Sequence, residues 1–264
     1  MKLGIIGLGN MATAMLTGII KAGIIAPADI KGSDPGIAER ERAQNDLGIN
    51  VTEDNKEAVK GSDYVILAVK PQVYETVLAE IKKAINKDQV LISIAPGKTT
   101  SYLEERLISG VKAVRLMPNT PALVGEGCTG ACRNKNVSDE EFEFVMKLLS
   151  GFGKAYKVKE EQMDAVVAVS GSSPAYVFML IDAMADGAVA AGLDRNTAIQ
   201  MAAQAVLGSA KMVLETGKHP GQLKDMVCSP AGTTIDAVEV LEQTGFRGSV
   251  MGAMSACVEK SRKI

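Results

Sequence analysis

The 264-residue sequence has no tryptophan, a single histidine and few aromatic side chains, which make up 4% of the chain. So few rings argue against a protein that stacks nucleic-acid bases. One histidine cannot complete a usual Cys/His zinc set, and the cysteines form no C-x-x-C pair. The cysteines are Cys128, Cys132, Cys228 and Cys257. We therefore expect no metal site, and free thiols in a reducing compartment.

An excess of either charge is also missing, since 29 basic residues stand against 31 acidic ones. The basic residues are scattered along the chain, which predicts no nucleic-acid partner. The first apolar run is broken by Gly7, Gly9 and Asn10 and so lacks the core of a signal peptide. No uninterrupted apolar stretch reaches membrane-spanning length. We expect a cytoplasmic protein with no membrane partner, and 47% hydrophobic residues are ample for a buried core.

The chain begins with a pattern typical of dinucleotide binding. A short apolar strand, Leu3–Ile6, runs into Gly7-x-Gly9-x-x-Ala12, and a helix is expected from residue 11 to residue 22. Gly7 permits a tight turn, Gly9 lets the backbone approach a pyrophosphate, and Ala12 lets the helix pack close to the strand. The phosphates would then lie at the helix N-terminus.

Short β-branched runs alternate with helical segments up to about residue 160, which predicts a mostly parallel sheet covered by helices. Further strands are expected at Asp29–Gly32, Tyr64–Val69, Val90–Ile94, Val111–Met117 and Cys128–Cys132. The run Tyr64–Val69 is apolar without alternation, as in a strand that is buried on both faces. We expect it near the centre of the sheet.

After Lys157 the pattern changes to Ala, Met and Val at helical spacing, which predicts an all-helical second half. Helices are expected over Tyr176–Ala191, Arg195–Thr216 and Thr233–Leu241. Asp194 is placed to cap the second of these, and Gly192 and Gly217 fit helix ends. The segment Met179–Ala191 is so apolar that it must be covered on most sides, so we expect a second subunit to cover it.

Three segments of the first half end strands with small residues, prolines or a lysine. Lys70 follows one strand, Ile94–Gly97 ends the next, and Arg115–Pro121 closes a third with two prolines. In open α/β sheets, ligands bind at the carboxyl ends of the strands, so these segments predict a shelf for a cofactor. A solvated lysine and an ordinary turn would explain the same residues.

Two polar turns precede helices in the second half. Ser170–Tyr176 places Pro174 near the first helical position, and Ser229–Thr234 leaves the first backbone N–H groups of its helix open to an anion. Helix capping alone would explain both turns equally well. His219 has no triad partner, and the acidic pair of residues 182 and 186 lacks the remaining ligands of a metal site, so we expect surface roles.

Together these motifs resemble those of the pyrroline-5-carboxylate reductase family, over nearly the whole chain and in the family's order. The motifs are Gly7–Ala12, Ala68–Gln72, Arg115–Pro121, Gly171–Tyr176 and Leu223–Ala237. The last is the most specific, since its Ser-Pro-x-Gly-x-Thr core is the family's signature. The sequence departs from the family at Ser173, where glycine is usual, and at Asp34, after the second strand.

The resemblance implies a doubly wound Rossmann-type domain over residues 1–160, which binds NAD(P)H. It also implies an all-helical dimerisation and substrate domain over residues 161–264, interlocked with its partner in a homodimer and sometimes stacked into a ring of dimers. The implied reaction is hydride transfer from NAD(P)H to the C=N bond of 1-pyrroline-5-carboxylate. Its product is L-proline, and the reaction is the last step of proline biosynthesis.

The resemblance also implies roles for particular residues. The backbone N–H groups of Gly232, Thr233 and Thr234 match those that hold the substrate carboxylate, and the Thr234 hydroxyl matches one that can bond the ring nitrogen. Lys70 matches a position that contacts the cofactor and faces the substrate region, and Glu161 lies near one implicated in proline binding. The implied cofactor-binding residues are Ile6, Gly7, Gly9, Asn10, Met11, Ser33, Asp34, Asn55, Ala68, Val69, Lys70, Pro71, Ala95 and Pro96.

Residues near the second strand favour different cofactors, some NADH and others NADPH. A carboxylate at the position of Asp34 usually bonds the ribose 2′-hydroxyl and repels a 2′-phosphate, which favours NADH. Ser33 could donate to a 2′-phosphate, and Asn55 matches a family position beside the adenosine. Arg40 and Arg42 lie a turn or more away. We predict dual use without a strong preference.

Two other functions compete with this interpretation. Dehydrogenases of the β-hydroxyacid and 6-phosphogluconate type share the N-terminal pattern and a helical second domain, but carry a catalytic lysine in a Gly-rich helix. The corresponding stretch Gly171–Leu180 contains no lysine. A dinucleotide-binding regulator would bind NAD(P)H without turnover, and the intact signature turn argues against it.

Overall fold

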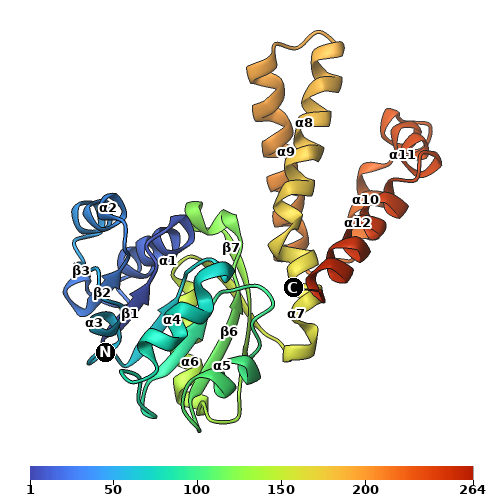
Figure 1. The fold of residues 1–264 in the computed structure, drawn as a ribbon. Helices are drawn as coiled ribbons and strands as arrows, with labels where there is room; N and C mark the ends of the chain where they lie inside the picture. Colours follow the sequence, from blue (N-terminus) through green and yellow to red (C-terminus); the bar gives the residue numbers. More distant parts are fainter. Residues whose placement is uncertain (264) are drawn as a thin grey trace. The chain divides into compact units, whose positions relative to one another are not determined.

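The computed structural model describes residues 1–263 and divides into two compact units (Figure 1). Unit 1 comprises Met1–Ser172 together with the chain from Cys257 onward, and unit 2 comprises Ser173–Ala256. Unit 1 contains the sheet, and unit 2 is built from helices.

Unit 1 is organised around an eight-stranded sheet of order β3-β2-β1-β4-β5-β6-β7-β8. The strands are β1 Leu3–Ile6, β2 Ile30–Ser33, β3 Asn50–Thr52, β4 Tyr64–Leu67, β5 Val90–Ser93, β6 Lys112–Met117, β7 Gly127–Arg133 and β8 Gly153–Lys157. Strands β1 to β6 pair in parallel, whereas β7 runs antiparallel to β6. This is a doubly wound order: β1, β2 and β3 are added toward one edge of the sheet, and from β4 onward the strands are added toward the other edge, so the order reverses between β1 and β4. The predicted fold class is confirmed.

The strand predicted at the centre of the sheet is β4, which pairs with β1 on one side and β5 on the other. Its side chains alternate between two buried clusters: Tyr64 and Ile66 lie in one, and Val65 and Leu67 lie in the other. Both faces of the sheet are therefore covered, which explains why this strand shows no polar alternation.

Two strands, β3 and β8, were not predicted from the sequence. β3 has three residues, and β8 carries two lysines, and both lie at the outer edges of the sheet. Edge strands are short or charged because one of their sides faces solvent, so they lack the apolar pattern that marks the inner strands.

Helices cover both faces of the sheet in unit 1 (Figure 1). They are α1 Asn10–Lys21, α2 Ile37–Leu47, α3 Asn55–Val59, α4 Tyr74–Ile81, α5 Thr100–Arg106, α6 Asp139–Ser150 and α7 Met163–Val166. Leu16 of α1 and Leu148 of α6 belong to one buried cluster, and Leu78 of α4 and Leu103 of α5 belong to the other.

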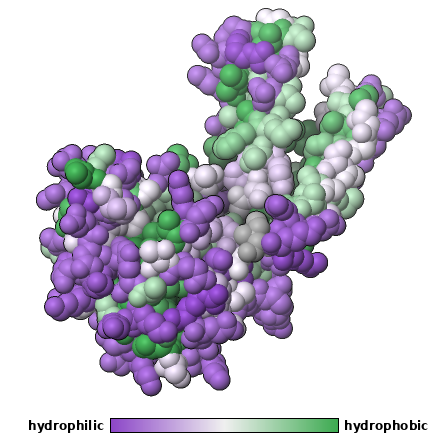
Figure 2. Space-filling view, viewed as in Figure 1, coloured by the Kyte–Doolittle hydropathy of each residue, from purple (hydrophilic) through white to green (hydrophobic). Residues whose placement is uncertain are grey.

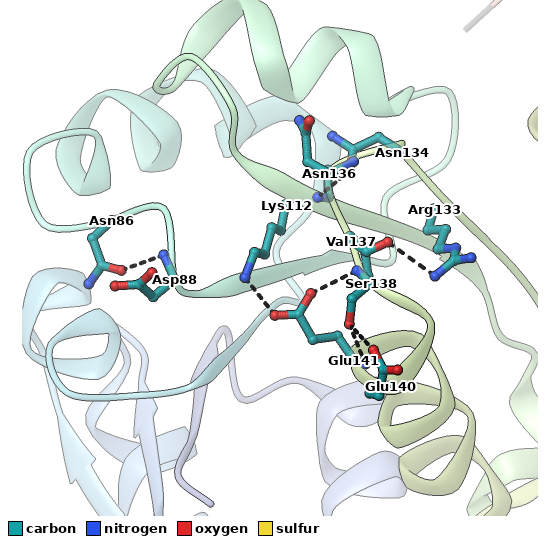
Figure 3. A network of polar contacts seen from close by, with 11 residues as sticks. Asn86, Asp88, Lys112, Arg133, Asn134, Asn136, Val137, Ser138, Glu140 and Glu141 are labelled. Atoms are coloured by element: carbon teal, nitrogen blue, oxygen red, sulfur yellow. Dashed lines mark hydrogen bonds and ion pairs between the residues drawn. The ribbon is translucent and has the colours of Figure 1, made fainter.

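A polar network fixes the start of α6 beside β6 (Figure 3). The Ser138 Oγ accepts from the Glu141 backbone N–H, and the Glu141 carboxylate accepts from the Ser138 N–H, forming a capping box. The Lys112 Nζ lies 2.6 Å from the other Glu141 oxygen. One glutamate thus caps a helix and ties it to the strand, which anchors the antiparallel end of the sheet.

Unit 2 contains the long helices α8 and α9, which lie side by side (Figure 1). Its helices are α8 Ser173–Ala190, α9 Arg195–Thr216, α10 Pro220–Val227, α11 Thr233–Gln243 and α12 Phe246–Ser261, whose last residues belong to unit 1. The Asp194 side chain accepts from the Thr197 N–H at 3.1 Å, and Gly217 ends α9 with a φ of 63°. The bounds predicted for α9 are confirmed.

Large apolar side chains lie exposed on unit 2, where Figure 2 shows apolar surface in green. Phe178 and Met179 of α8 are 62% and 72% exposed, and Leu214 of α9 is 73% exposed. The helical run Glu160–Ala190, 31 residues long, is apolar enough to cross a membrane by length and composition alone. The expectation that no apolar stretch reaches membrane-spanning length holds for the uninterrupted sequence but not for the helix, because serines and glycines that break the apolar run in sequence lie within the helix.

Candidate functional site

The loop after β1 is joined to both neighbouring strands. The Gly7 N–H donates to the Ser33 carbonyl at 2.8 Å, and the Ala68 N–H donates to the Ile6 carbonyl at 2.8 Å. Gly7 has a φ of 93°, and a Cβ there would lie 2.7 Å from the Ala68 carbonyl oxygen. Only glycine tolerates both the backbone conformation and the close approach. The turn that the sequence predicted at Gly7 is present.

The N-terminus of α1 is open. Gly9 is its N-cap, no side chain caps the helix, and the first turn holds no acidic residue. A Cβ on Gly9 would meet no heavy atom within 4 Å, and Asn10 is exposed whereas Met11 is half-buried. The first N–H groups of a helix need a partner, and here only an anion or water can supply it. These residues therefore fit the pyrophosphate of a dinucleotide.

The carboxylate of Asp34, after β2, is held by two backbone groups. Its Oδ2 accepts from the Leu8 N–H at 2.8 Å, and its Oδ1 accepts from the Gly36 N–H at 2.9 Å. Ser33 is fully buried, and its Oγ donates to the Asn55 Oδ1 at 2.8 Å. The expectation that Ser33 could donate to a 2′-phosphate is wrong for this conformation, because burial and the bond to Asn55 occupy its hydroxyl.

The two arginines near Asp34 are engaged with the backbone. Arg40 Nη1 donates to the carbonyls of Asp34 and Pro35 at 2.6 Å and 3.0 Å. Arg42 Nη2 donates to the Leu8 carbonyl at 2.7 Å. Both side chains therefore stabilise the loops that surround the Asp34 carboxylate.

The loops after β4 and β5 lie at the same edge of the sheet as Gly7, because β1, β4 and β5 are parallel neighbours. The residues predicted there are Ala68, Val69, Lys70, Pro71, Ala95 and Pro96. Ala95 is buried, Pro71 and Pro96 are half-buried, and Lys70 is exposed. The Lys70 ammonium makes no ion pair with any residue from 1 to 263. A cation is thus available at the edge where ligands bind in such sheets.

The turn with two prolines after β6 has a role that the sequence did not reveal. The Asn119 Nδ2 donates to the Ser170 carbonyl at 3.0 Å, and its Oδ1 accepts from the Cys128 N–H at 2.8 Å. Ser170 lies in a π-helical segment, Val167–Gly171, where the ordinary backbone bonds are shifted. One buried amide therefore joins this segment to the sheet.

A second contact missed from the sequence involves Glu160. Its two carboxylate oxygens accept from the Thr100 N–H at 2.8 Å and the Thr100 hydroxyl at 2.7 Å. Arg115, whose side chain is 8% exposed, lies 3.7 Å away. Glu161, the residue predicted for the substrate, is exposed. Two adjacent glutamates offer no sequence pattern that tells which one is held, so only the fold identifies Glu160.

The signature turn of unit 2 leads into α11. The Gly232 N–H donates to the Ser229 carbonyl at 3.1 Å, and a Cβ on Gly232 would lie 2.3 Å from the Ser229 Oγ. Ala231 has a φ of 56°, the left-handed region that favours glycine. No side chain caps α11, and the half-buried Thr234 hydroxyl bonds to no residue from 1 to 263. The first N–H groups of α11 and a hydroxyl are thus open to a ligand.

The remaining candidates have local roles. His219 caps α10 by accepting from the Gly221 N–H at 3.1 Å, and Asp186 lies 2.6 Å from Arg195. Ser173, expected in a tight turn, is the first residue of α8. Over residues 1–263, no group of three His, Cys, Asp or Glu side chains is placed to hold a metal ion.

Comparison with known proteins agrees with this geometry. The family model described as "Pyrroline-5-carboxylate reductase dimerisation" matches residues 160–264, and "NADP oxidoreductase coenzyme F420-dependent" matches residues 2–97. Pyrroline-5-carboxylate reductase of Escherichia coli (strain K12) is 49% identical over 263 residues, which cover 100% of this chain and 98% of that protein.

Two solved structures extend the comparison to the fold. The pyrroline-5-carboxylate reductase from Coxiella burnetii superposes with a TM-score of 0.94 and 34% identity, covering 99% of this chain and 97% of that one. The Plasmodium falciparum pyrroline carboxylate reductase with NADP bound gives a TM-score of 0.89 at 36% identity, with 99% and 97% covered. The chain therefore belongs to the pyrroline-5-carboxylate reductase family.

Proposed function

We propose that this protein reduces the C=N bond of 1-pyrroline-5-carboxylate with NAD(P)H to give L-proline, the last step of proline biosynthesis. The observation that carries the proposal is the 49% identity to the Escherichia coli enzyme over the full length of both chains. The open helix N-terminus after Gly9 supports it, because that terminus fits the pyrophosphate of the cofactor.

The chemistry asks little of the protein beyond binding and orientation. The bound cofactor supplies a hydride, and the protonated imine carbon is already a hydride acceptor, so no nucleophile or metal is needed. The chain's own residues must hold the imine in a defined orientation and exclude water. The residues that matter most are therefore those that bind the carboxylate and the ring nitrogen of the substrate.

We assign the substrate carboxylate to the backbone N–H groups of Gly232, Thr233 and Thr234. Their open position at the start of α11 supports this assignment, since a helix N-terminus favours an anion. We assign the Thr234 hydroxyl to the ring nitrogen, where it can hold or pass a proton. The absence of a competing side-chain bond at Thr234, within residues 1–263, leaves the hydroxyl available.

Lys70 is proposed to contact the cofactor and to face the substrate region. Its exposed ammonium at the carboxyl edge of β4 supports this role. Glu161 is proposed as a second substrate contact. Its carboxylate is exposed and therefore free to turn toward a ligand.

The chain forms a homo-oligomer through its helical part, in keeping with the dimerisation model that matches residues 160–264. We propose that residues 1–160 bind the cofactor, and that residues 161–264 interlock with a second copy in a dimer, which can stack into a ring. Exposed Phe178, Met179 and Leu214 supply the apolar surface for such contacts. We further propose a cytoplasmic location and use of both NADH and NADPH.

The reaction is tested by following NADH and NADPH absorbance with the purified protein and 1-pyrroline-5-carboxylate. Oxidation that depends on the imine is the expected result. Cofactor binding without oxidation by either cofactor would instead identify a regulator or an enzyme for another imine.

The role of Thr234 is tested by Thr234→Val, which removes the hydroxyl and keeps the shape. We expect turnover to fall about tenfold to a hundredfold, because one hydrogen bond to the reacting group is lost. Cofactor affinity should stay unchanged. Thr244→Val is the matched control, since Thr244 follows the other end of α11 and, within residues 1–263, its hydroxyl bonds only to the carbonyls of Val240 and Leu241. Equal turnover in both variants would remove Thr234 from the mechanism.

A further inference from the structure

The Asp34 carboxylate is fixed in a position that suits a hydroxyl ligand. Each of its oxygens accepts one backbone N–H, from Leu8 and from Gly36. An ionised carboxylate has about four acceptor sites, so each oxygen keeps room for one further donor. The two hydroxyls of an adenosine ribose supply such donors, whereas a 2′-phosphate at pH 7 supplies negative charge in place of one of them. Asp34 cannot turn away from a phosphate without losing both backbone bonds.

A hollow of about 450 Å³ lies beside Pro35, the residue after Asp34. Its lining residues are Pro35, Glu53, Asp54, Asn55, Lys56 and Glu80. Three carboxylates and one ammonium give this lining a net charge of about -2 at neutral pH, before Asp34 is counted. A dianionic phosphate entering the hollow would therefore be repelled.

Most of the donors that could receive a phosphate are already engaged. In sites for NADP an arginine near the second strand usually accommodates the phosphate. Here Arg40 donates to two carbonyls and its Nη2 lies 3.8 Å from Glu53. The Ser33 hydroxyl donates to Asn55, and the Asn55 Nδ2 donates to Glu80 at 2.6 Å. The Lys56 ammonium, which also lines the hollow, makes no ion pair with residues 1–263 and so stays available to a phosphate.

From this arrangement we propose that the adenosine end of the cofactor site selects the 2′-hydroxyl over the 2′-phosphate, with Asp34 as the selecting residue and Glu80 as its support. NADH is then the better cofactor by about tenfold, which still permits turnover with NADPH. The inference rests on the proposed function only for the identity of the cofactors. It does not depend on which imine is reduced.

The test measures the binding of 5′-AMP and 2′,5′-ADP to the full-length protein by titration calorimetry, with no substrate present. The wild type should bind 5′-AMP about tenfold more tightly than 2′,5′-ADP. Asp34→Asn removes the charge and keeps the size, so we expect the two affinities to become equal within about threefold. The ratio of kcat/KM for NADH and NADPH should change in the same direction. Asp46→Asn, at an exposed carboxylate of α2, is the control and should keep the wild-type ratio.

A second variant, Glu80→Gln, keeps the test decisive if Asp34→Asn does not fold. It should tighten 2′,5′-ADP binding about threefold and leave 5′-AMP binding unchanged, because Glu80 contributes charge and no ribose contact. The proposal is overturned if the wild type binds both nucleotides equally, or if Lys56→Gln weakens 2′,5′-ADP binding tenfold, which would make Lys56 a phosphate ligand. Discrimination between the nucleotides without imine reduction would contradict the proposed function alone.

Discussion

The two units handle their apolar residues in opposite ways. In unit 1, strand and helix residues such as Leu67 and Val145 are fully buried between the sheet and its covering helices. In unit 2, Met179 and Leu214 are 72% and 73% exposed within one chain. A sheet with helices on both faces completes its core in a single chain, whereas a few apolar helices leave one side open. Unit 1 therefore completes its packing within one chain, whereas we propose that a second copy covers the exposed apolar residues of unit 2.

The largest effect that separates the units comes from two phenylalanines. Phe152 is 1% exposed in unit 1, and Phe178 is 62% exposed in unit 2. We expect Phe152→Ala to lower the free energy of unfolding by about 3–5 kcal/mol, because it leaves a cavity. Phe178→Ala should act mainly on dimer association. Urea unfolding at several protein concentrations distinguishes them, since only the second effect should depend on concentration.

Equal losses for both variants at every protein concentration would contradict this comparison. Such a result would mean that Phe178 is buried within its own chain in solution.

A charge on the exposed face of unit 2 gives the next largest effect. Met179→Asp should weaken dimer association about a hundredfold, or about 2.7 kcal/mol, because an unpaired carboxylate would be buried at the interface. Sedimentation at decreasing protein concentration measures the dissociation. The control is Lys211→Gln, which removes an exposed charge from α9, where Nζ lies 3.5 Å from Glu215. A dimer unaffected by Met179→Asp would place the interface elsewhere.

The smallest effect concerns the alkaline stability of unit 1. Burial, with the Glu160 charge adding to it, raises the pKa of the Cys132 thiol from 9.0 to about 12. The folded state therefore favours the neutral thiol. The stability that the folded state gains from this neutral thiol is fully present below pH 9 and is lost as the pH rises toward 12.

Between pH 9 and pH 11 we expect Cys132 to account for a loss of about 2 kcal/mol in the free energy of unfolding. Urea unfolding at both pH values should show a smaller loss for Cys132→Ala, although that variant starts from a lower stability. Burial also raises the pKa of Tyr64 to about 12, so part of the loss should remain. An identical pH dependence in the variant would show that the thiol ionises as easily in the folded protein.

The inner strands and the glycine turn of unit 1 could be predicted because each leaves a local trace in the sequence. Tyr64–Leu67 is continuously apolar since both of its faces are covered, and Gly7 must be glycine since its φ is 93°. The bounds of α9 were predictable for the same reason, because Asp194 and Gly217 mark its ends. The edge strands β3 and β8 escaped prediction because they bury too little to impose an apolar pattern.

In the candidate site too, some features leave a local trace in the sequence and others do not. The sequence by itself indicated an open helix N-terminus at Gly9, but at Gly232 it allowed either an open N-terminus or a capped one, and the structure shows no capping side-chain bond at either end. Only the tertiary structure decided that the Ser33 hydroxyl donates a hydrogen bond to Asn55. It also decided that Glu160 bonds to Thr100, whereas the neighbouring Glu161 is exposed. Local conformation follows from neighbouring residues, whereas a partner distant in sequence depends on which strands the fold places side by side.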